Sequence, residues 1–337
     1  MGIYDKMGLT WENGPIEGSI ESQRSGVAVS LLSTNHEPRI LFPLILFKGL
    51  TMKKLTPILS FLTAASVLFI LSAVQVQAQL PEIAHRIHSM AHRGDYYNAP
   101  ENTLEGFKMA IETGVDSCEF DVQRTKDGVL VLSHDGTLER ASNGACKERI
   151  CDMTFEEVRK VDVGAYKGEA WKNTQCPTLD EALDLFKGSG CIPVIEIKVF
   201  GTERQIADAI IAHDMVKEVA LVSFNHESIR RMWEYCPGIY AYRNGGNRGD
   251  KTDEEFVAWF IESQKDCPFK VANPDWGQMK NTHTVKLLKE AGFIVSTWII
   301  DDPKLMNELL DAGIDTMTTN RPAVQVQVFK EREAKNK

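Results

Sequence analysis

The sequence predicts an α/β protein, a (β/α)8 TIM barrel with a small insertion after an early strand. Short apolar runs alternate with helical patterns over about 250 residues, which is typical of parallel strands joined by crossover helices. About eight strands over that length favour a closed barrel over a doubly wound open sheet. The stretch at about 135–177 interrupts the alternation because it is polar and lacks a clear strand. We interpret it as the insertion.

Each strand is predicted from a short apolar run and each helix from an amphipathic pattern. We expect strands at residues 87–91, 117–122, 129–133, 192–197, 219–223, 239–242, 269–272, 294–297 and 316–318. We expect helices at residues 103–113, 179–186, 203–213, 227–235, 253–263, 282–291 and 303–312. Gly114, Gly292 and Gly313 each follow one of these helices, where a left-handed cap favours glycine.

The N-terminal region predicts an export signal rather than part of the fold. The segment MKKLTPILSFLTAASVLFILSAVQVQAQ begins at Met52, with two lysines, an apolar run and a small-residue cleavage site ending at Ala78. Residues 52–78 are therefore interpreted as a secretory signal peptide and residues 1–51 as upstream sequence from a misassigned start. Residues 79–337 form the single predicted domain. The alternative is a retained membrane anchor, since the apolar run is near spanning length.

Charge and cysteine usage limit the partners of this domain. The chain has 38 basic and 47 acidic residues, of which six and five lie in residues 1–78, so the remainder has a net charge of about −10. This argues against nucleic acid or an anionic membrane as the main partner. All seven cysteines follow residue 78, and an exported chain can form disulfides; Cys146 and Cys151 are close enough in sequence to pair. We expect a periplasmic or secreted bacterial protein with no stable membrane span after signal cleavage.

Ionisable residues stand at the ends of the first predicted strands, where the active site of a barrel lies. His92 and Arg93 follow the first strand, and the segment CEFDV places Glu119 and Asp121 in the second. Because side chains alternate along a strand, the two carboxylates share one face, while the apolar Phe120 lies on the other. The carboxylates would repel one another unless a cation lies between them.

Two later strands also end in ionisable residues. The segment GVLVLSHD, taken as the third strand, ends in His134 and Asp135. The segment IPVIEIK carries Glu196 and Lys198 two residues apart, and therefore on one face of its strand. Two histidines at consecutive strand ends, with three carboxylates nearby, are difficult to explain as structural residues alone.

Together these residue types indicate phosphoryl transfer. The carboxylates of Glu119, Asp121 and Glu196 suit a hard cation such as Ca²⁺ or Mg²⁺. Two histidines outside the metal shell suit general acid–base catalysis near neutral pH. Arg93 and Lys198 suit a phosphate group.

The sequence resembles the glycerophosphodiester phosphodiesterase (GDPD) family, in its exported bacterial type, over about residues 88–322. The first and most specific segment is HRGDYYNAPENTLEGFKMAIETGVDSCEFDVQRTKDGVLVLSHDGTLERASNG. It is continued by CPTLDEAL, IPVIEIK, LVSFNHESIRRM and, more weakly, GIDTMTTNRP.

The resemblance implies a barrel enzyme that hydrolyses glycerophosphodiesters, which are deacylated phospholipids, to glycerol 3-phosphate and an alcohol. It implies one divalent cation, Ca²⁺ or Mg²⁺, bound by Glu119, Asp121 and Glu196. It also implies that His92 and His134 form the acid–base pair. Which histidine is the acid, and whether water or the glycerol 2-hydroxyl is the nucleophile, stay open.

The resemblance implies supporting roles for five further residues. Arg93 and Lys198 would contact the phosphate, and Glu101 would lie near the metal or its waters. Asn102 would orient the neighbouring loop. Trp298 would line the substrate cleft.

The chain departs from the family pattern at two late strands. The usual Trp-Thr-Val-Asn is Trp-Ile-Ile-Asp here, ending in Asp301, and the usual Thr-Asp-x-Pro is Thr-Asn-Arg-Pro, with Asn320 in place of the acid. We interpret both changes as rim changes that affect substrate choice rather than activity.

Three other functions are compatible with the sequence. One is a phospholipase D-like or phosphoinositide-cleaving enzyme, which would need an apolar rim for which Tyr96, Tyr97 and Trp276 are candidates. Another is a non-catalytic protein that binds glycerophosphodiesters, and the last is a structural envelope protein. The head group, the oligomeric state and the disulfide pairing are not predicted.

Overall fold

The protein is described here by a computed structural model, in which two units are distinguished. The described residues are 19–20, 29–30 and 80–335. The first unit, Met1–Val76, contains β1 (Ser19–Ile20) and β2 (Val29–Ser30), which pair antiparallel. The predicted signal peptide at 52–78 lies outside the described residues. The second unit, Gln77–Lys337, contains the barrel.

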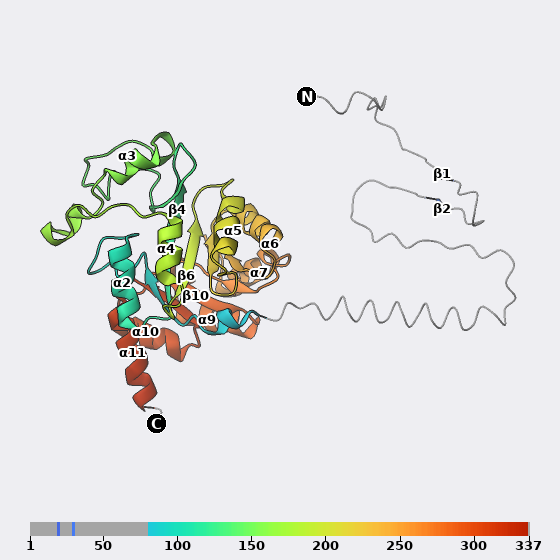
Figure 1. The fold of residues 1–337 in the computed structure, drawn as a ribbon. Coiled ribbons are helices and arrows are strands. Elements are labelled where there is room, and N and C mark those ends of the chain that lie inside the picture. Colours follow the sequence, from blue (N-terminus) through green and yellow to red (C-terminus); the bar gives the residue numbers. More distant parts are fainter. Residues whose placement is uncertain (1–18, 21–28, 31–79, 336–337) are drawn as a thin grey trace, which may run out of the picture. The chain divides into compact units, whose positions relative to one another are not determined.

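Eight parallel strands form a nearly closed barrel with helices between them (Figure 1). In the order in which they lie side by side, they are β8 (Tyr240–Arg243), β7 (Ala220–Ser223), β6 (Ile192–Ile197), β4 (Ser117–Arg124), β3 (Ser89–His92), β11 (Thr316–Thr319), β10 (Ile294–Trp298) and β9 (Val271–Ala272). The predicted (β/α)8 TIM barrel is therefore confirmed.

The strands β8 and β9 meet at a seam without a ladder of paired residues between them. The contacts at this seam are made just past the two strand ends. Gly245 N donates to Asn273 O at 3.0 Å, and Asn273 Nδ2 donates to Asn244 Oδ1 at 2.7 Å.

Alternation along the strands divides their side chains between the barrel interior and the helices outside. On β4, Glu119 and Asp121 point inward, and Phe120 packs outward against Phe107 and Phe186 at ring-centroid distances of 5.2 and 5.7 Å. Apolar interior residues form a separate buried cluster: Ile83, Ala84, Ile87, Met90, Ile192, Val194, Ala220, Val222, Tyr240, Tyr242, Phe269 and Val271. The short helix η1 (Glu82–His85) supplies the first two and so contributes to this interior cluster.

Helices follow the strands along the chain and bury their apolar faces on the barrel. They are α2 (Leu104–Thr113), α4 (Leu179–Phe186), α5 (Glu203–Ala212), α6 (His226–Tyr235), α7 (Asp253–Ser263), α8 (Trp276–Met279), α9 (Thr282–Glu290), α10 (Pro303–Asp311) and α11 (Pro322–Lys335). Capping residues set many of their starts. Thr178 and Thr252 form capping boxes with Glu181 and Glu255, and Gly114 ends α2 at φ 81°.

The third predicted strand is not a barrel strand, and that prediction is wrong. β5 (Leu130–Leu132) pairs antiparallel with β4, with Val122 opposite Leu132. The reason is a short turn in which Thr125 N donates to Val129 O at 2.9 Å, which sends the chain straight back along β4. An apolar run carries no information about strand direction, so the sequence pattern did not distinguish the two arrangements.

The segment between β5 and α4 corresponds to the predicted insertion. It contains α3 (Phe155–Arg159) and the short helices η2 (Ile150–Asp152), η3 (Ala165–Lys167) and η4 (Glu169–Trp171). A small core of its own holds it together: Val131, Leu138, Ile150, Met153, Val158, Val163 and Cys176. Figure 1 shows α3 in green, away from the helices that surround the barrel.

Two further observations concern the cysteines and the length of the helices in the described part of the chain. All seven cysteines lie among residues 80–335 and are free thiols, so Cys146 and Cys151 are not paired. No helix in the described part of the chain is long and apolar enough to cross a membrane.

Candidate active site

A pocket with a volume of about 150 Å³ opens among the ends of the barrel strands. Its polar wall contains six of the predicted site residues: His92, Arg93, Glu119, His134, Glu196 and Lys198. Its other wall is largely apolar and includes Phe224 and Trp298, whose rings meet edge to face with centroids 5.9 Å apart. The structure thus brings residues from β4 and from the ends of β3, β5, β6 and β10 into one cavity.

The loop from β3 to α2 holds His92 and Arg93 by tight backbone contacts. Arg93 and Gly94 have φ values of 55° and 92°, in the left-handed region. A Cβ on Gly94 would lie 2.8 Å from the carbonyl carbon of Gly106, so only glycine allows the loop to pack on the first turn of α2. Asp95 N donates to Gly106 O at 2.9 Å and secures this approach.

Three carboxylates are buried together, and two of them, Glu119 and Glu196, line the pocket. Ligand oxygens of Glu119, Asp121 and Glu196 all lie within 4.8 Å of one another. Asp121 is fully buried; its Oδ2 accepts a hydrogen bond from Asn102 Nδ2 at 2.9 Å and lies 3.3 Å from Arg93 Nε. Its Oδ1 is buried without a hydrogen-bond partner among the described residues. An orphaned carboxylate oxygen in an all-oxygen cluster fits a hard divalent cation.

The electrostatics of the cluster lead to the same conclusion. Burial, and then the neighbouring Asp121, raise the pKa of Glu119 well above its usual value and also raise the pKa of Glu196. Lys198 Nζ lies 2.8 Å from Glu196 Oε1 and 3.5 Å from Asp121 Oδ1. Burial acts to lower the pKa of Lys198, but the two carboxylates outweigh it and raise that pKa. Cationic charge is therefore favoured in this cluster.

His92 is held by an amide at the end of the neighbouring strand. Its Nδ1 lies 2.7 Å from Asn320 Oδ1, and Asn320 in turn contacts Asp301. Burial, and then the nearby Arg93, lower the pKa of His92 to about 4, so the ring is neutral at neutral pH. Asn320 thus touches one of the predicted catalytic residues, so the change at this position reaches beyond the rim. That it affects substrate choice rather than activity stays a prediction.

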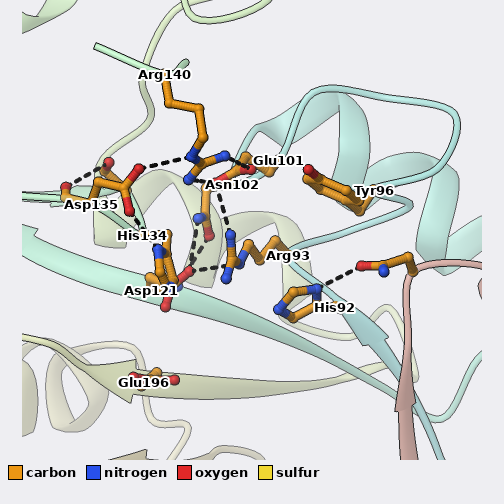
Figure 2. Close-up of polar contacts among 12 residues, drawn as sticks. His92, Arg93, Tyr96, Glu101, Asn102, Asp121, His134, Asp135, Arg140 and Glu196 are labelled. Atoms are coloured by element: carbon orange, nitrogen blue, oxygen red, sulfur yellow. Dashed lines mark hydrogen bonds and ion pairs between the residues drawn. The ribbon is translucent and has the colours of Figure 1, made fainter. Parts of the chain in front are cut away.

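His134 belongs to a different network, which Figure 2 shows. Its Nδ1 lies 2.7 Å from Asp135 Oδ1, and Asp135 Oδ2 accepts from Arg140 Nε at 2.8 Å. Arg140 also binds Glu101 with both terminal nitrogens, at 2.8 Å for Nη2 to Oε1. Glu101 accepts a further bond from Arg93 Nη1 at 3.2 Å. An alternating chain of charges therefore connects the loops that carry the two histidines.

Glu101 has other contacts than the sequence suggested. Its oxygens bind two guanidinium groups, and it lies outside the group of three carboxylates that can hold a metal. Tyr166 of η3 accepts a hydrogen bond from Glu101 N at 3.0 Å, so the insertion packs on this loop. A substrate-binding role for Glu101 stays a prediction.

Sequence reasoning missed the roles of Asp135, Arg140, Tyr166 and Phe224. Asp135 and Arg140 carried a local signal, since Asp135 follows His134 directly and Arg140 lies five residues later in the first resemblance segment. Tyr166 lies 65 residues beyond Glu101, and the contact depends on how the insertion folds back.

Comparisons with known proteins agree with the observed fold and with the family that the sequence resembles. The model of the glycerophosphoryl diester phosphodiesterase family matches residues 92–324. A glycerophosphodiester phosphodiesterase of Caldanaerobacter subterraneus subsp. tengcongensis is 32% identical over 250 residues, covering 72% of this chain and 97% of the relative. One of Bacillus subtilis is 27% identical over 260 residues, covering 70% and 84%.

Solved structures share the barrel. The structure of an Oleispira antarctica phosphodiesterase, in complex with the product sn-glycerol-3-phosphate, matches with a TM-score of 0.63 and 24% identity, covering 72% of this chain and 96% of that one. A glycerophosphodiester phosphodiesterase of Parabacteroides distasonis matches with a TM-score of 0.59, covering 75% and 99%. The family model and the Caldanaerobacter relative each span most of the barrel unit, and from them we conclude that the chain belongs to the glycerophosphoryl diester phosphodiesterase family.

Proposed function

We propose that this chain is a metal-dependent phosphodiesterase that hydrolyses glycerophosphodiesters to glycerol 3-phosphate and an alcohol. The observation that carries the proposal is one pocket lined by two histidines, two cationic side chains and two carboxylates that belong to a buried group of three. The names of the similar proteins support it, as does the product bound to the Oleispira structure.

Glu119, Asp121 and Glu196 would hold the divalent cation, Ca²⁺ or Mg²⁺. When bound there, the cation supplies positive charge for a phosphate oxygen and so stabilises the negative charge that develops during hydrolysis. Arg93 and Lys198 line the same wall and share that charge as hydrogen-bond donors. Their pairing with the carboxylates also fixes where they point.

We assign different roles to the two histidines because their Nδ1 partners differ. His92 faces a neutral amide and is uncharged at neutral pH, so it can accept a proton from the attacking hydroxyl. His134 faces the carboxylate of Asp135, which accepts a hydrogen bond from its Nδ1 and fixes the orientation of the ring. We assign the complementary role to His134, which is to protonate the leaving alkoxide, otherwise a poor leaving group.

Replacing either histidine tests the proposal. Loss of a general acid or base lowers turnover by about 10²- to 10⁴-fold, so His92→Ala and His134→Ala should each release glycerol 3-phosphate from glycerophosphocholine at least 10²-fold more slowly. The exposed His283 is the matched control, and His283→Ala should keep wild-type turnover. Chelation should abolish activity, and Ca²⁺ or Mg²⁺ should restore it. Near-wild-type turnover in either variant, or activity insensitive to chelators, would contradict the scheme.

We propose a small, deacylated diester rather than an intact phospholipid as the substrate. Of the three aromatic residues considered for a membrane-binding rim, only Tyr97 is exposed, at 61%. Tyr96 stacks under Lys167 at 4.4 Å, and Trp276 packs against a buried cluster. Assaying glycerophosphocholine beside intact phosphatidylcholine vesicles tests this choice, because faster cleavage of the vesicles would contradict it.

We also propose, from sequence alone, that residues 52–78 are a cleavable bacterial export signal and residues 1–51 are not part of the mature protein. The lysine pair, apolar run and small residues before position 79 support this. N-terminal sequencing of the periplasmic or secreted protein should begin near residue 79. A mature protein that retains residues 52–78 would contradict the proposal.

A further inference from the structure

Three neighbouring strands bring Asp301, Asn320 and His92 together at one end of the barrel. β10, β11 and β3 lie side by side, with Trp298 opposite Thr318 and Thr319 opposite Ala91. His92 is the last residue of β3, and Asn320 follows β11 directly. Asp301 lies in the short turn between β10 and α10.

Asp301 accepts three hydrogen bonds from the β11 side. Its Oδ1 accepts from Thr319 Oγ1 at 2.9 Å and from Asn320 N at 2.8 Å. Its Oδ2 accepts from Asn320 Nδ2 at 2.8 Å. Because a carboxylate has no proton to donate, the part of the Asn320 amide that faces it must be the NH₂ group.

This contact decides how the rest of the Asn320 amide is oriented. An amide can usually be placed either way round, since its oxygen and nitrogen have nearly the same shape. Here the NH₂ group is bound to Asp301, so the oxygen points at His92 Nδ1, 2.7 Å away. A carbonyl oxygen only accepts, so Nδ1 must carry the proton. A neutral imidazole has one N–H, which leaves Nε2 with its lone pair free.

We propose that Asp301 and Asn320 are positioning residues that fix the tautomer of His92, with Nδ1 protonated and Nε2 available as the base. Neither residue touches the substrate in this scheme, and both act through the ring of His92. The proposal rests on the proposed function, because it gives the reason why His92 is able to accept a proton.

Replacing Asp301 with asparagine should reverse the tautomer. An amide at 301 can turn its NH₂ group toward Asn320, whose own amide then flips to accept that bond. The NH₂ group of Asn320 would then face His92 Nδ1 and move the proton to Nε2. In a serine protease a wrong histidine tautomer lowers kcat by about 10⁴-fold. We expect at least a 10-fold loss of kcat in Asp301→Asn, with KM changed less than threefold.

Exchanging the two residues should restore the tautomer. In the double variant Asp301→Asn with Asn320→Asp, the amide at 301 donates to the new carboxylate, whose other oxygen accepts from His92 Nδ1. We expect kcat at least 10-fold above that of the single variant. Asp302→Asn is the matched control: Asp302 caps α10 by accepting from Lys304 N at 3.1 Å, and asparagine caps equally well. Asp302→Asn should leave kcat unchanged.

Imidazole ¹⁵N spectra of the whole chain at pH 7 test the tautomer directly, with the His92 signal assigned by its loss in His92→Gln. We expect an Nδ1–H pattern in the wild type, an Nε2–H pattern in Asp301→Asn and Nδ1–H again in the double variant. An Nε2–H pattern in the wild type, or full kcat in Asp301→Asn, would overturn the proposal. An inactive wild type with the Nδ1–H pattern would instead overturn the proposed function, since the tautomer is observed without turnover.

Discussion

At the scale of single residues, the site depends on side chains that connect its parts as much as on those that face the pocket. Arg140 lies between Asp135, the partner of His134, and Glu101, which also binds Arg93. A guanidinium group is suited to this position because its donors reach two carboxylates at once in a fixed geometry. Lysine would offer one point charge and could not satisfy both.

We expect Arg140→Lys to lower kcat by about 10-fold or more, because a 1 Å misplacement of catalytic groups is enough for such a loss. Stability should fall by only about 1–2 kcal/mol, less than for a fully buried pair, because Glu101 keeps its bond to Arg93. Steady-state kinetics and denaturant unfolding measure the two effects. The exposed Lys147, also in the insertion, gives the control Lys147→Arg, which should change neither. Unchanged kcat in Arg140→Lys would show that the connection does not position His134.

At the scale of elements, the two faces of β4 have different tasks. The inner face carries residues of the candidate site, and the outer face stabilises the fold. Glu119 and Asp121 point into the barrel, and Phe120 between them completes a cluster of three buried rings with Phe107 and Phe186. Large apolar side chains on the outer face anchor the strand on α2 and α4. The carboxylates are thereby held together although they repel one another.

Phe120→Ala should destabilise the protein by about 3–5 kcal/mol, because it removes a buried ring and leaves a cavity. Urea unfolding measures the loss. The control is Phe200→Ala, which removes a side chain that is 48% exposed and should cost about 0.5 kcal/mol or less. If Phe120→Ala lowers the free energy of unfolding no more than the control does, the outer face of β4 is not the anchor of the carboxylates.

The same scale shows how much of the fold the sequence predicts. Every predicted strand and helix is present within about two residues, because periodicity records which face is buried. The direction of β5 was not predictable, since direction is set by the turn that precedes it. The sequence did not predict α11, because its VQVQV segment alternates between apolar and polar residues as a strand does. In the structure the segment is helical, and the buried Gln325 donates to Met317 O and accepts from Met90 N.

The candidate site likewise has a part that the sequence predicts and a part that it does not. Glu119, Asp121, Glu196, His92 and His134 were predictable because each stands in or beside a strand. The network beyond them was not predictable, because its contacts depend on how loops approach one another. Asn320, for example, lies 228 residues from His92 along the chain.

At the scale of the whole molecule, the three buried carboxylates couple the stability of the barrel to pH and to cations. The pKa of Glu119 is raised in the folded state by burial, so the folded protein binds its proton more tightly than the unfolded chain does. The stability linked to Glu119 is therefore fully present below its usual pKa of about 4.5. It is lost as pH rises through the higher, folded-state pKa.

Without divalent cations, the wild-type Tm should therefore fall with rising pH relative to that of Glu119→Gln, which has no such proton. Added Ca²⁺ or Mg²⁺ should raise the wild-type Tm more at pH 8 than at pH 5, because ligation requires carboxylates. At 100 times Kd the stabilisation is about 2.7 kcal/mol. Thermal unfolding with and without chelator measures both trends. A cation effect that is equal at both pH values would contradict this coupling.

The seam between β8 and β9 implies an uneven distribution of local unfolding. Amide protons exchange with solvent fastest where backbone groups lack ladder partners, and they exchange slowly where strands are paired on both sides. In the order of the strands, β4 and β3 are the pair farthest from the seam, and they carry His92 and two of the three carboxylates. We therefore expect amide exchange to be fast at the seam and slow in β3 and β4, the paired strands that carry these site residues.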